Sequence, residues 1–278
     1  MTPSYMMDNR PNTPPTALTK CLEAVTIWLR QSHLKLNPQK TEVLWVGNKK
    51  PSDMEMRLPQ LDGTTLTTST TVKSLGVTLD ASLTMEAQIA RVAHQAFYQL
   101  RQVKQLAPYL SQKDVATVIH ATVTSRLDYW NSLYAGLPST LTRKLQLIQN
   151  AAARVLTNTP WKSHIRLTLQ QLHWLPVESR IRFKVLVLTF KAIHGSGPTY
   201  LRDRLSLYSP QRTLHSSDAN LLEIPNHQAI RLASTRKRAF SALAPSWWNE
   251  LPTEIRAMTE LSQFRRVCKT TLFRQAFG

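Results

Sequence analysis

After residue 84 the apolar residues recur at intervals of three and four, the period of a helix that buries one face. This pattern predicts four helices, over about residues 84–106, 111–127, 139–157 and 176–194. Ser111, with Asp114 three residues later, has the character of an N-cap, and Pro176 is favourable in a first turn. The residues expected to face the core are Ile89, Val92, Ala96, Leu100, Val103, Val115, Ile119, Val123, Leu127, Leu141, Leu145, Ile148, Ala152, Val155, Ile181, Val185, Leu188 and Ala192.

The first 80 residues show a different pattern, which predicts α+β structure. The proline-rich residues 1–15 are expected to be irregular, because proline breaks regular elements. A helix follows over residues 16–32, and residues 41–47 contain an apolar run that predicts a buried strand. Residues 64–79 are rich in threonine and other β-branched residues, which predicts further strands. The apolar face expected for the first helix consists of Leu18, Leu22, Val25 and Leu29.

The last third of the chain has shorter periodic segments. Its predicted elements are a strand over residues 221–225, a helix with a basic start over 235–243, an aromatic turn over 245–252 and an amphipathic helix over 262–277. The segment from Gly195 to Pro198 is explained better as a helix C-cap followed by proline than as a phosphate-binding loop. The expected fold class is therefore α+β and mostly α. A small β/α region precedes a helical bundle and an irregular helical C-terminal region.

The distribution of charge adds a functional expectation. The chain carries 35 lysines and arginines against 17 aspartates and glutamates, a formal net charge of +18. Residues 1–90 hold nine basic and eight acidic residues, so residues 91–278 hold the remaining 26 and nine, a net charge of +17. Such an excess attracts polyanions, of which nucleic acid is the usual one. The alternative is a basic soluble protein without a specific partner.

Other classes of function find little support in the sequence. Cys21 and Cys268 are far apart and form no C-x-x-C pair, so neither a zinc site nor a disulfide framework is expected. No apolar run reaches the ~18 residues of a membrane span, and the polar N-terminus lacks the apolar core of a signal peptide. We therefore expect no metal, no cofactor and no membrane association, and a location in either the nucleus or the cytoplasm.

Several segments resemble motifs of one known family. Residues 34–44, LKLNPQKTEVL, and residues 73–80, KSLGVTLD, stand in the order and spacing found at the end of the palm of LINE-type (non-LTR) retrotransposon reverse transcriptases. The first resembles a helix-to-strand motif with a lysine near the nucleotide site, and the second resembles the primer-grip hairpin. The segments that resemble the chicken-repeat-like group of these elements are LHWLPV at 172–177, RAF at 238–240, WNELP at 248–252 and LFRQAF at 272–277.

The resemblance extends from about residue 17 to residue 277 and implies four parts. These are an irregular leader (1–15), a palm remnant with a primer-grip-like hairpin (16–80), a helical thumb-like domain (81–195) and a LINE-specific C-terminal region (196–278). The implied function is the binding of template–primer nucleic acid, both RNA and DNA, without sequence preference. The resemblance also implies association with the missing N-terminal part of the polymerase.

The resemblance further implies that the chain does not polymerise DNA by itself. Family members carry an adjacent aspartate pair upstream of the helix predicted here over residues 16–32, and these carboxylates bind two divalent ions. This chain contains no adjacent acidic pair. We therefore expect no catalytic residue and no enzyme activity, with magnesium bound only in the intact enzyme. In that intact enzyme Lys40 would be the lysine of the nucleotide site.

Twelve residues are candidates for contacts with nucleic acid. The resemblance implies Lys40, Lys73 and Gly76, the glycine as a position of close backbone approach or a bulge in the hairpin. The other candidates are basic residues of two predicted helices and of one short basic run, namely Arg143, Lys144, Arg154, Arg180, Arg182, Lys184, Arg236, Lys237 and Arg238. For each of these taken singly, an ordinary solvated position is the stronger interpretation, whereas the collective excess favours binding.

Two alternatives to nucleic-acid binding stay open at this point. One is a domesticated protein-interaction module, and the other is a translated transposon relic without a selected function. The sequence does not identify the RNA that would be bound or the oligomeric state. Trp174, Trp247 and Trp248 stand close to prolines and are expected to pack in the core rather than stack on bases.

Overall fold

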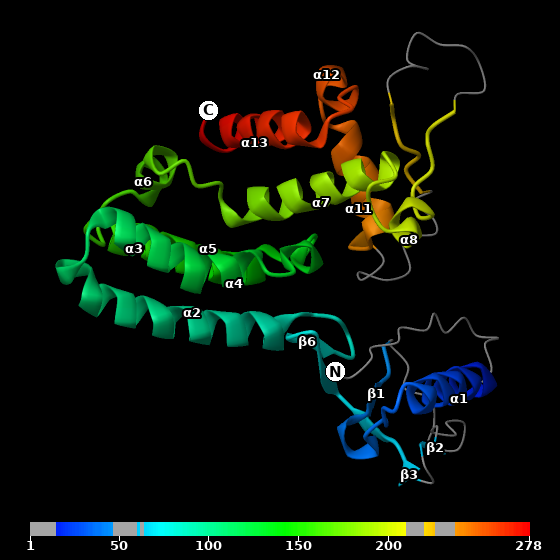
Figure 1. Cartoon of the computed structure of the whole chain (residues 1–278). Coiled ribbons are helices and arrows are strands. Elements are labelled where there is room, and N and C mark those ends of the chain that lie inside the picture. Colours follow the sequence, from blue (N-terminus) through cyan, green and yellow to red (C-terminus); the bar gives the residue numbers. More distant parts are fainter. Residues whose placement is uncertain (1–14, 47–59, 62–63, 210–219, 226–236) are drawn as a thin grey trace. The chain divides into compact units, whose positions relative to one another are not determined.

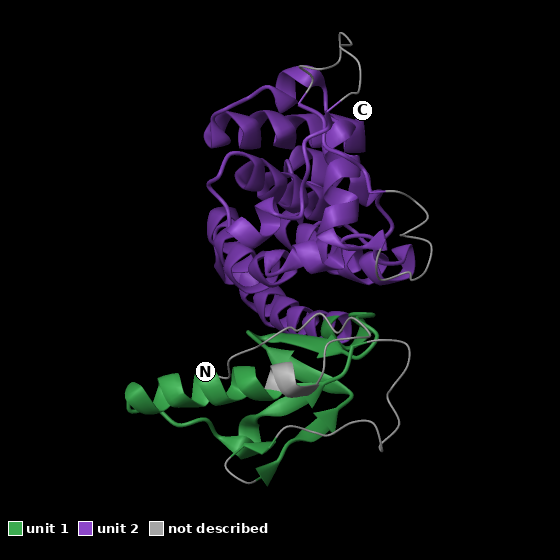
Figure 2. Cartoon of the chain, turned by 90° about the vertical axis from the view of Figure 1, so that its right-hand side faces the viewer, with its two compact units in different colours: residues 1–88 green, residues 89–278 purple. Residues whose placement is uncertain are grey.

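The structure, a computed structural model, describes residues 15–46, 60–61, 64–209, 220–225 and 237–278 (Figure 1). The chain forms two compact units, unit 1 (residues 1–88) and unit 2 (residues 89–278) (Figure 2). The described strands all belong to unit 1, whereas the described part of unit 2 is helical apart from one isolated bridge. The expected fold class, α+β and mostly α, is confirmed at this level. The assignment of residues 16–80, 81–195 and 196–278 to palm, thumb and C-terminal region concerns ancestry and stays a prediction.

Unit 1 combines one long helix with short paired strands. Helix α1 (Pro15–Gln31) confirms the first predicted helix, and the 3-10 turn η1 (Pro38–Lys40) follows it. The strand pairs are β1 (Glu42–Leu44) with β4 (Thr67–Ser69) in parallel, β2 (Gln60–Leu61) with β3 (Thr64–Thr65) antiparallel, and β5 (Thr71–Ser74) with β6 (Val77–Asp80) antiparallel. The β structure predicted over residues 64–79 is thereby confirmed.

A small apolar core lies between α1 and the strands of unit 1. It consists of the buried Leu36, Leu61 and Leu66, with Leu22, Val25, Leu29 and Val43 packed against them. The expected apolar face of α1 is confirmed at Leu22, Val25 and Leu29, while the side chain of Leu18 lies outside the described residues. The strand predicted over 41–47 is shorter than expected and only partly buried, because β1 is paired along one edge in the described sheet and Val46 is exposed.

The axes of the long helices α2, α5, α7 and α13 are roughly aligned, and α7 runs opposite to α2 and α13 (Figure 1). In chain order the described elements from residue 86 onward are α2 (Glu86–Leu106), η2 (Ala107–Tyr109), α3 (Gln112–Ile119), η3 (His120–Thr124), α4 (Ser125–Asp128), η4 (Asn131–Tyr134), α5 (Ser139–Thr157), α6 (Ile165–Gln171), α7 (Val177–Ile193), α8 (Thr199–Arg202), α11 (Phe240–Asn249), α12 (Thr253–Arg256) and α13 (Leu261–Phe277). Helix α2 begins in the last three residues of unit 1.

The apolar stripe predicted for the first helix of the bundle, α2, is buried at all five positions, from Ile89 to Val103. The stripe predicted for α5 is correct except at its end, where Leu156 is buried and Val155 only partly so. Helix α5 contacts α3, α6 and α7. Because three helices cover it, its buried face is wider than one stripe and includes Gln149 as well as Leu156.

The segment between residues 111 and 128 is not the single regular helix that the sequence predicted. Its N-cap is confirmed, since the Oγ atom of Ser111 accepts a hydrogen bond from the backbone N–H of Asp114 at 3.2 Å. Helix α3 then passes through the π-helical turn η3 into α4. The core residues Val115, Ile119, Val123 and Leu127 are all buried. Their constant spacing of four would drift by about 40° per step around a regular α-helix, and the wider π turn offsets part of that drift.

Helix α7 lies at the centre of unit 2 and contacts α4, α5, α8, α11 and α13. The predicted core residues Ile181, Val185 and Ala192 are buried, but Leu188 is only partly so. Leu186 and Phe190 are buried in its place, in an apolar cluster with residues of α11 and α13. The predicted stripe was therefore too narrow, because helices from the C-terminal third cover a second face of α7.

The end of α7 confirms the predicted helix C-cap. Gly195 has a φ of 70°, the left-handed conformation that favours glycine. The backbone N–H of Ser196 donates to the carbonyl of Lys191 at 2.9 Å, and that of Gly195 donates to the carbonyl of Ala192 at 3.4 Å. This pair of hydrogen bonds is the Schellman arrangement, which satisfies carbonyls at the helix end.

The C-terminal third differs from the prediction in two places. Residues 221–225 form no strand, because the side chain of Asn249 binds both backbone groups of Leu222, at 2.9 and 2.8 Å, leaving one isolated bridge to Leu207. Helix α11 starts at Phe240 and includes most of the predicted aromatic turn. Trp174 and Trp248 are buried, as expected, and Trp247 is partly buried against the same core. The last predicted helix, α13, is confirmed.

We predict that Ile119→Ala and Leu186→Ala each lower the free energy of unfolding by about 2–5 kcal/mol, because both side chains are fully buried. Leu188→Ala should cost about 1 kcal/mol or less, since its side chain is already partly in water. Urea titration followed by circular dichroism measures all three. An equal cost at residues 186 and 188 would mean that α7 buries a different face.

Candidate nucleic-acid interface

Lys40 is the last residue of η1 in unit 1. The side chain of Asn37 caps this turn by accepting the backbone N–H of Gln39 at 3.0 Å. The carbonyl of Asn37 accepts the backbone N–H of Lys40 at 3.1 Å and the hydroxyl of Thr41 at 2.8 Å. These bonds fix the turn that leads into β1 and leave the Lys40 side chain exposed. The lysine is therefore accessible to an anionic group, and its nucleotide-site role stays a prediction.

Gly76 lies in the two-residue turn of the β5–β6 hairpin. Leu75 and Gly76 both have positive φ, 47° and 80°, as in the type I′ turns that join short hairpins. The register is regular from Thr71 to Ser74, so of the two expectations for Gly76 the bulge is absent, and close backbone approach to a ligand stays a prediction. In the hairpin Gly76 permits the tight turn. Lys73 stands opposite Thr78 with its side chain exposed.

Asp80, at the end of this hairpin, is a residue that the sequence did not single out. Its two carboxylate oxygens accept the backbone N–H groups of Thr84 and Met85, each at 2.8 Å. Burial acts to raise the pKa of the Asp80 carboxyl, but these backbone hydrogen bonds outweigh it and hold the pKa below its usual 3.8. Asp80 is therefore ionised at neutral pH and organises the turn that precedes α2.

The candidates on α5 divide into two groups. Arg143 and Lys144 are exposed and share one face of the helix with the exposed Leu147. Arg154 is partly buried, and its Nη2 donates to the carbonyls of Trp161 and Ser163 at 3.4 and 3.3 Å. Arg154 therefore holds the loop after α5, while Arg143 and Lys144 are accessible to a ligand.

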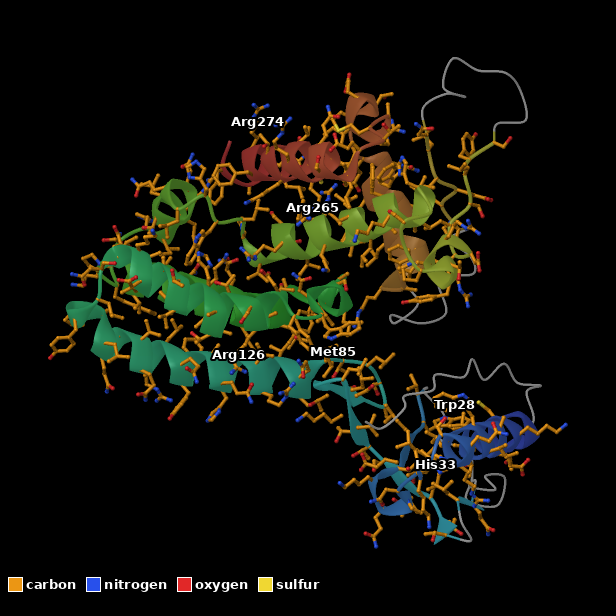
Figure 3. All side chains as sticks on the ribbon, in the orientation of Figure 1. Trp28, His33, Met85, Arg126, Arg265 and Arg274 are labelled. Carbon is orange, nitrogen blue, oxygen red and sulfur yellow. The ribbon has the colours of Figure 1, made fainter. Side chains whose placement is uncertain are left out.

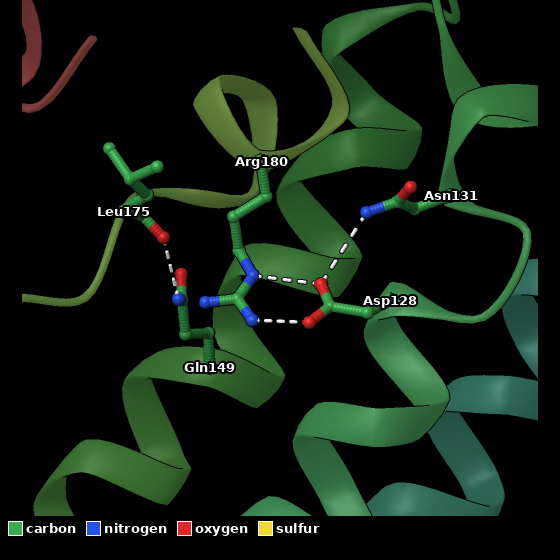
Figure 4. A network of polar contacts seen from close by, with 5 residues as sticks. All are labelled: Asp128, Asn131, Gln149, Leu175 and Arg180. Carbon is green, nitrogen blue, oxygen red and sulfur yellow. Dashed lines mark hydrogen bonds and ion pairs between the residues drawn. The ribbon is translucent and has the colours of Figure 1, made fainter. Parts of the chain in front are cut away.

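Arg180 belongs to a polar network between α4, η4 and α7 (Figure 4). Its Nε donates to Oδ1 of Asp128 at 2.8 Å and its Nη2 donates to Oδ2, a bidentate ion pair. Asn131 donates to the same Oδ1 at 3.4 Å. Nearby, Gln149 of α5 donates to the carbonyl of Leu175 at 2.8 Å. The guanidinium of Arg180 thus joins α7 to α4, and a contact of Arg180 with nucleic acid stays a prediction.

Of the other two candidates on α7, Arg182 has partners within unit 2, whereas Lys184 is accessible to a ligand. Arg182 forms an ion pair with Glu250 and lies over the ring of Trp247, with its guanidinium carbon 6.0 Å from the ring centroid. It therefore ties α7 to the end of α11. Lys184 is exposed and belongs to the outer side of the helix.

The basic run at residues 236–238 is only partly described. Arg236 lies outside the described residues, and Lys237 is exposed. The stem of Arg238 covers Gly136, where an added methyl group would lie 2.9 Å from Cγ of the arginine. Arg238 therefore closes against the loop before α5, and Gly136 leaves the room for it.

A second basic surface, on α2, was missed because only the apolar stripe of that helix was considered. His94, Phe97, Tyr98, Arg101 and Lys104 are all exposed. Their spacings of three and four place them on one side of the helix, opposite the buried stripe. Glu86 in the first turn is the sole acidic residue of α2. The sequence contained this signal as a pair of aromatic residues between basic ones.

Helix α13 carries a third basic surface that the sequence interpretation passed over. Arg265, Arg266, Lys269 and Arg274 are exposed, and residues 261–277 contain no aspartate or glutamate. Arg265 and Arg274 are labelled on this helix in Figure 3. The buried side of α13 contributes Phe264, Cys268 and Leu272 to the core. The helix therefore separates an apolar inner side from a basic outer side.

The described residues offer no cluster of metal ligands, and the buried cysteine of unit 2 is not a thiolate. Their histidines, cysteines, aspartates and glutamates form no group of three that could hold a metal ion. Burial raises the pKa of the Cys268 thiol to about 12 despite the opposing effect of Arg182, so the thiol stays protonated at neutral pH. No described helix combines the length and the apolar character needed to cross a membrane.

Comparison with known proteins identifies no relative, since no family model, no curated protein and no solved structure matches the chain. Evidence about the function of the chain therefore comes from its own residues and surfaces.

We predict that Arg180→Gln and Asp128→Asn each lower the free energy of unfolding by about 1–3 kcal/mol, because each leaves a partly buried charged partner without its hydrogen bonds. The double variant should cost less than the sum of the two single changes, since both remove the same ion pair. Thermal unfolding of all four proteins gives the coupling energy. Additive costs would show that the pair contributes nothing to holding α7.

Proposed function

We propose that this chain derives from the C-terminal part of a LINE-type reverse transcriptase and that unit 2 binds nucleic acid of the template–primer kind. On this proposal it binds RNA and DNA with little sequence preference and does not polymerise DNA by itself. Motif resemblance supports the ancestry, and the surface chemistry of unit 2 supports the binding.

The exposed face of α2 is the observation that carries the proposal. Phe97 and Tyr98 are 39% and 51% exposed, and Arg101 and Lys104 lie on the same side of the helix. Two aromatic rings exposed next to each other on a helix offer an apolar patch that another molecule can cover. Proteins that bind nucleic acid combine aromatic rings, which stack on the bases, with cations, which neutralise the phosphates.

The charge of unit 2 supports binding that does not depend on sequence. Residues 129–177 contain no aspartate or glutamate, and neither does α13. Exposed lysines and arginines without acidic neighbours bind phosphates, which every nucleic acid carries in the same repeat. Contacts of this kind fix position on the strand and carry no direct information about sequence.

The structure narrows the set of residues that the proposal involves. Arg154, Arg180, Arg182 and Arg238 hold parts of unit 2 together, so their loss would disturb the fold as well as any binding. Exposed candidates in unit 2 are therefore more informative to change. They are Arg143, Lys144, Lys184 and Lys237 from the sequence, with Arg101, Lys104, Arg265, Arg266 and Lys269 from the structure.

We predict that Arg101→Gln with Lys104→Gln weakens the salt dependence of binding to duplex nucleic acid. Each phosphate contact contributes about −0.9 to the slope of log affinity against log salt on B-form DNA, so the slope should become shallower by up to about 1.8. Fluorescence anisotropy at several salt concentrations measures it. Phe97→Ala with Tyr98→Ala should instead weaken binding to single strands with little change in slope.

The matched control is Lys20→Gln with Lys35→Gln, which removes the same charge from exposed positions in unit 1. This control should leave the slope close to that of the unchanged protein. If the unchanged protein, the α2 charge variant and this control all give equal slopes, the charge acts diffusely. The assignment of α2 to the interface would then be withdrawn.

A second candidate function, protein interaction through unit 1, is favoured by one observation. Ile27 and Trp28, adjacent residues near the end of α1, are both more than half exposed, as is Leu34 in the following loop. Exposed apolar side chains such as these mark a contact with another protein more often than with an anion. The resemblance to LINE-type reverse transcriptases implies association with the N-terminal part of the polymerase. The partner to test is therefore the fingers and palm of a related retrotransposon.

We predict that the separately produced fingers and palm of a chicken-repeat-like element bind the chain and that Trp28→Lys weakens this binding at least tenfold. Binding should weaken because the contact would bury an unpaired ammonium group among apolar side chains, which costs free energy. Isothermal titration calorimetry gives the affinities, with Trp161→Lys as the matched control on an exposed tryptophan of unit 2. Equal affinities for both variants would exclude α1 as the contact.

A further inference from the structure

Trp161, in the loop between α5 and α6, is the most exposed of the chain's seven tryptophans, with 77% of its surface in water. The guanidinium carbon of Arg154 lies 4.9 Å from the centroid of its ring. A cation at this distance covers one face of the indole and is attracted by it. The ring is therefore fixed from one side and open on the other.

The position of Arg154 is determined by the loop itself. Its Nη2 bonds to the carbonyls of Trp161 and Ser163 bridge the turn that carries the indole. The loop begins at Asn158, whose left-handed backbone ends α5, and the backbone N–H of Thr159 also donates to the carbonyl of Arg154 at 3.2 Å. Arg154 and Trp161 thus form a platform that is ordered before any ligand arrives, which lowers the entropy cost of binding.

The chemistry around this platform selects the ligand. Lys162 and His164 are exposed directly after Trp161, and no acidic residue occurs between Asp128 and Glu178. A planar aromatic group next to an anionic group fits this combination, because the indole offers a π-face and the lysine a cation. Arg166, in the first turn of α6, donates from Nη2 to the carbonyl of Ala276 at 3.3 Å and so ties this helix to the end of α13.

We propose that Trp161, backed by Arg154, stacks on one unpaired nucleobase of a single-stranded nucleic acid, with Lys162 on the adjoining phosphate. This inference deepens the proposed function, on which it rests, by assigning a single-strand subsite in unit 2 separate from the α2 surface. One open face of the indole takes one base. The stacking contact requires no particular base, since every base has a π-face.

The test compares a blunt RNA–DNA hybrid with the same hybrid carrying a short single-stranded extension, by fluorescence anisotropy at one salt concentration. The unchanged protein should bind the extended hybrid more tightly than the blunt one. Trp161→Ala should reduce that gain at least about fivefold, the smaller limit of a lost base–aromatic stack. Trp161→Phe should retain most of the gain, because the phenyl ring keeps a π-face.

Tyr200→Ala, at a tyrosine of α8 that is 66% exposed, is the matched control and should leave the gain unchanged. Circular dichroism melts of each variant verify that the fold is intact, which is expected because Trp161 contributes little to the core. If the blunt hybrid binds normally and Trp161→Ala keeps the full gain, the inference is wrong while the proposed function stands. If neither hybrid nor a free single strand binds the unchanged protein, the proposed function fails as well.

Discussion

Unit 2 depends on the enclosure of α7, because this helix contacts elements from both earlier and later parts of the chain. The Arg180–Asp128 pair sets its contact with α4, and the apolar cluster around Leu186 and Phe190 sets its contacts with α11 and α13. A helix buried on two faces needs few polar positions, and Lys184 is the one exposed residue between Arg180 and Ile193. The surfaces available for ligands therefore lie on the peripheral helices, where one side of each remains in water.

The basic residues divide by chemistry as well as by position. The four candidates that the structure uses to join elements are all arginines, Arg154, Arg180, Arg182 and Arg238. Among the candidates named from the sequence, the exposed ones are lysines except for Arg143, and α2 and α13 add the exposed arginines Arg101, Arg265 and Arg266. This division follows from the side chains, because a planar guanidinium donates several hydrogen bonds in a fixed geometry, whereas an ammonium group keeps its hydration and remains at the surface. The large formal charge of the chain thus has both a structural and a surface component.

Local periodicity was sufficient to predict most helices, because a helix with one buried side repeats its apolar residues in consecutive turns, as in α2 and α13. It failed where distant segments add a second buried face, as at Leu188 and Leu186, or where a side chain replaces a strand partner, as Asn249 does for Leu222. The sequence interpretation did not predict the π turn between α3 and α4, although the core residues there are spaced four apart throughout. The site was predicted in part, since sequence shows which residues are basic, while only the fold shows that Arg180 is paired and that Phe97 and Tyr98 are uncovered.

The absence of acidic residues between positions 129 and 177 also affects the stability of the free protein. Like charges that fold into one unit repel one another, and this self-repulsion opposes the compact state. Added salt screens the repulsion over roughly 10 Å at 0.1 M and so favours folding, although the same screening weakens attraction to a polyanion. Stability and affinity should therefore respond to ionic strength in opposite directions. A bound polyanion would relieve the repulsion more locally than salt does, so the proposed ligand would also act as a counterion that stabilises unit 2.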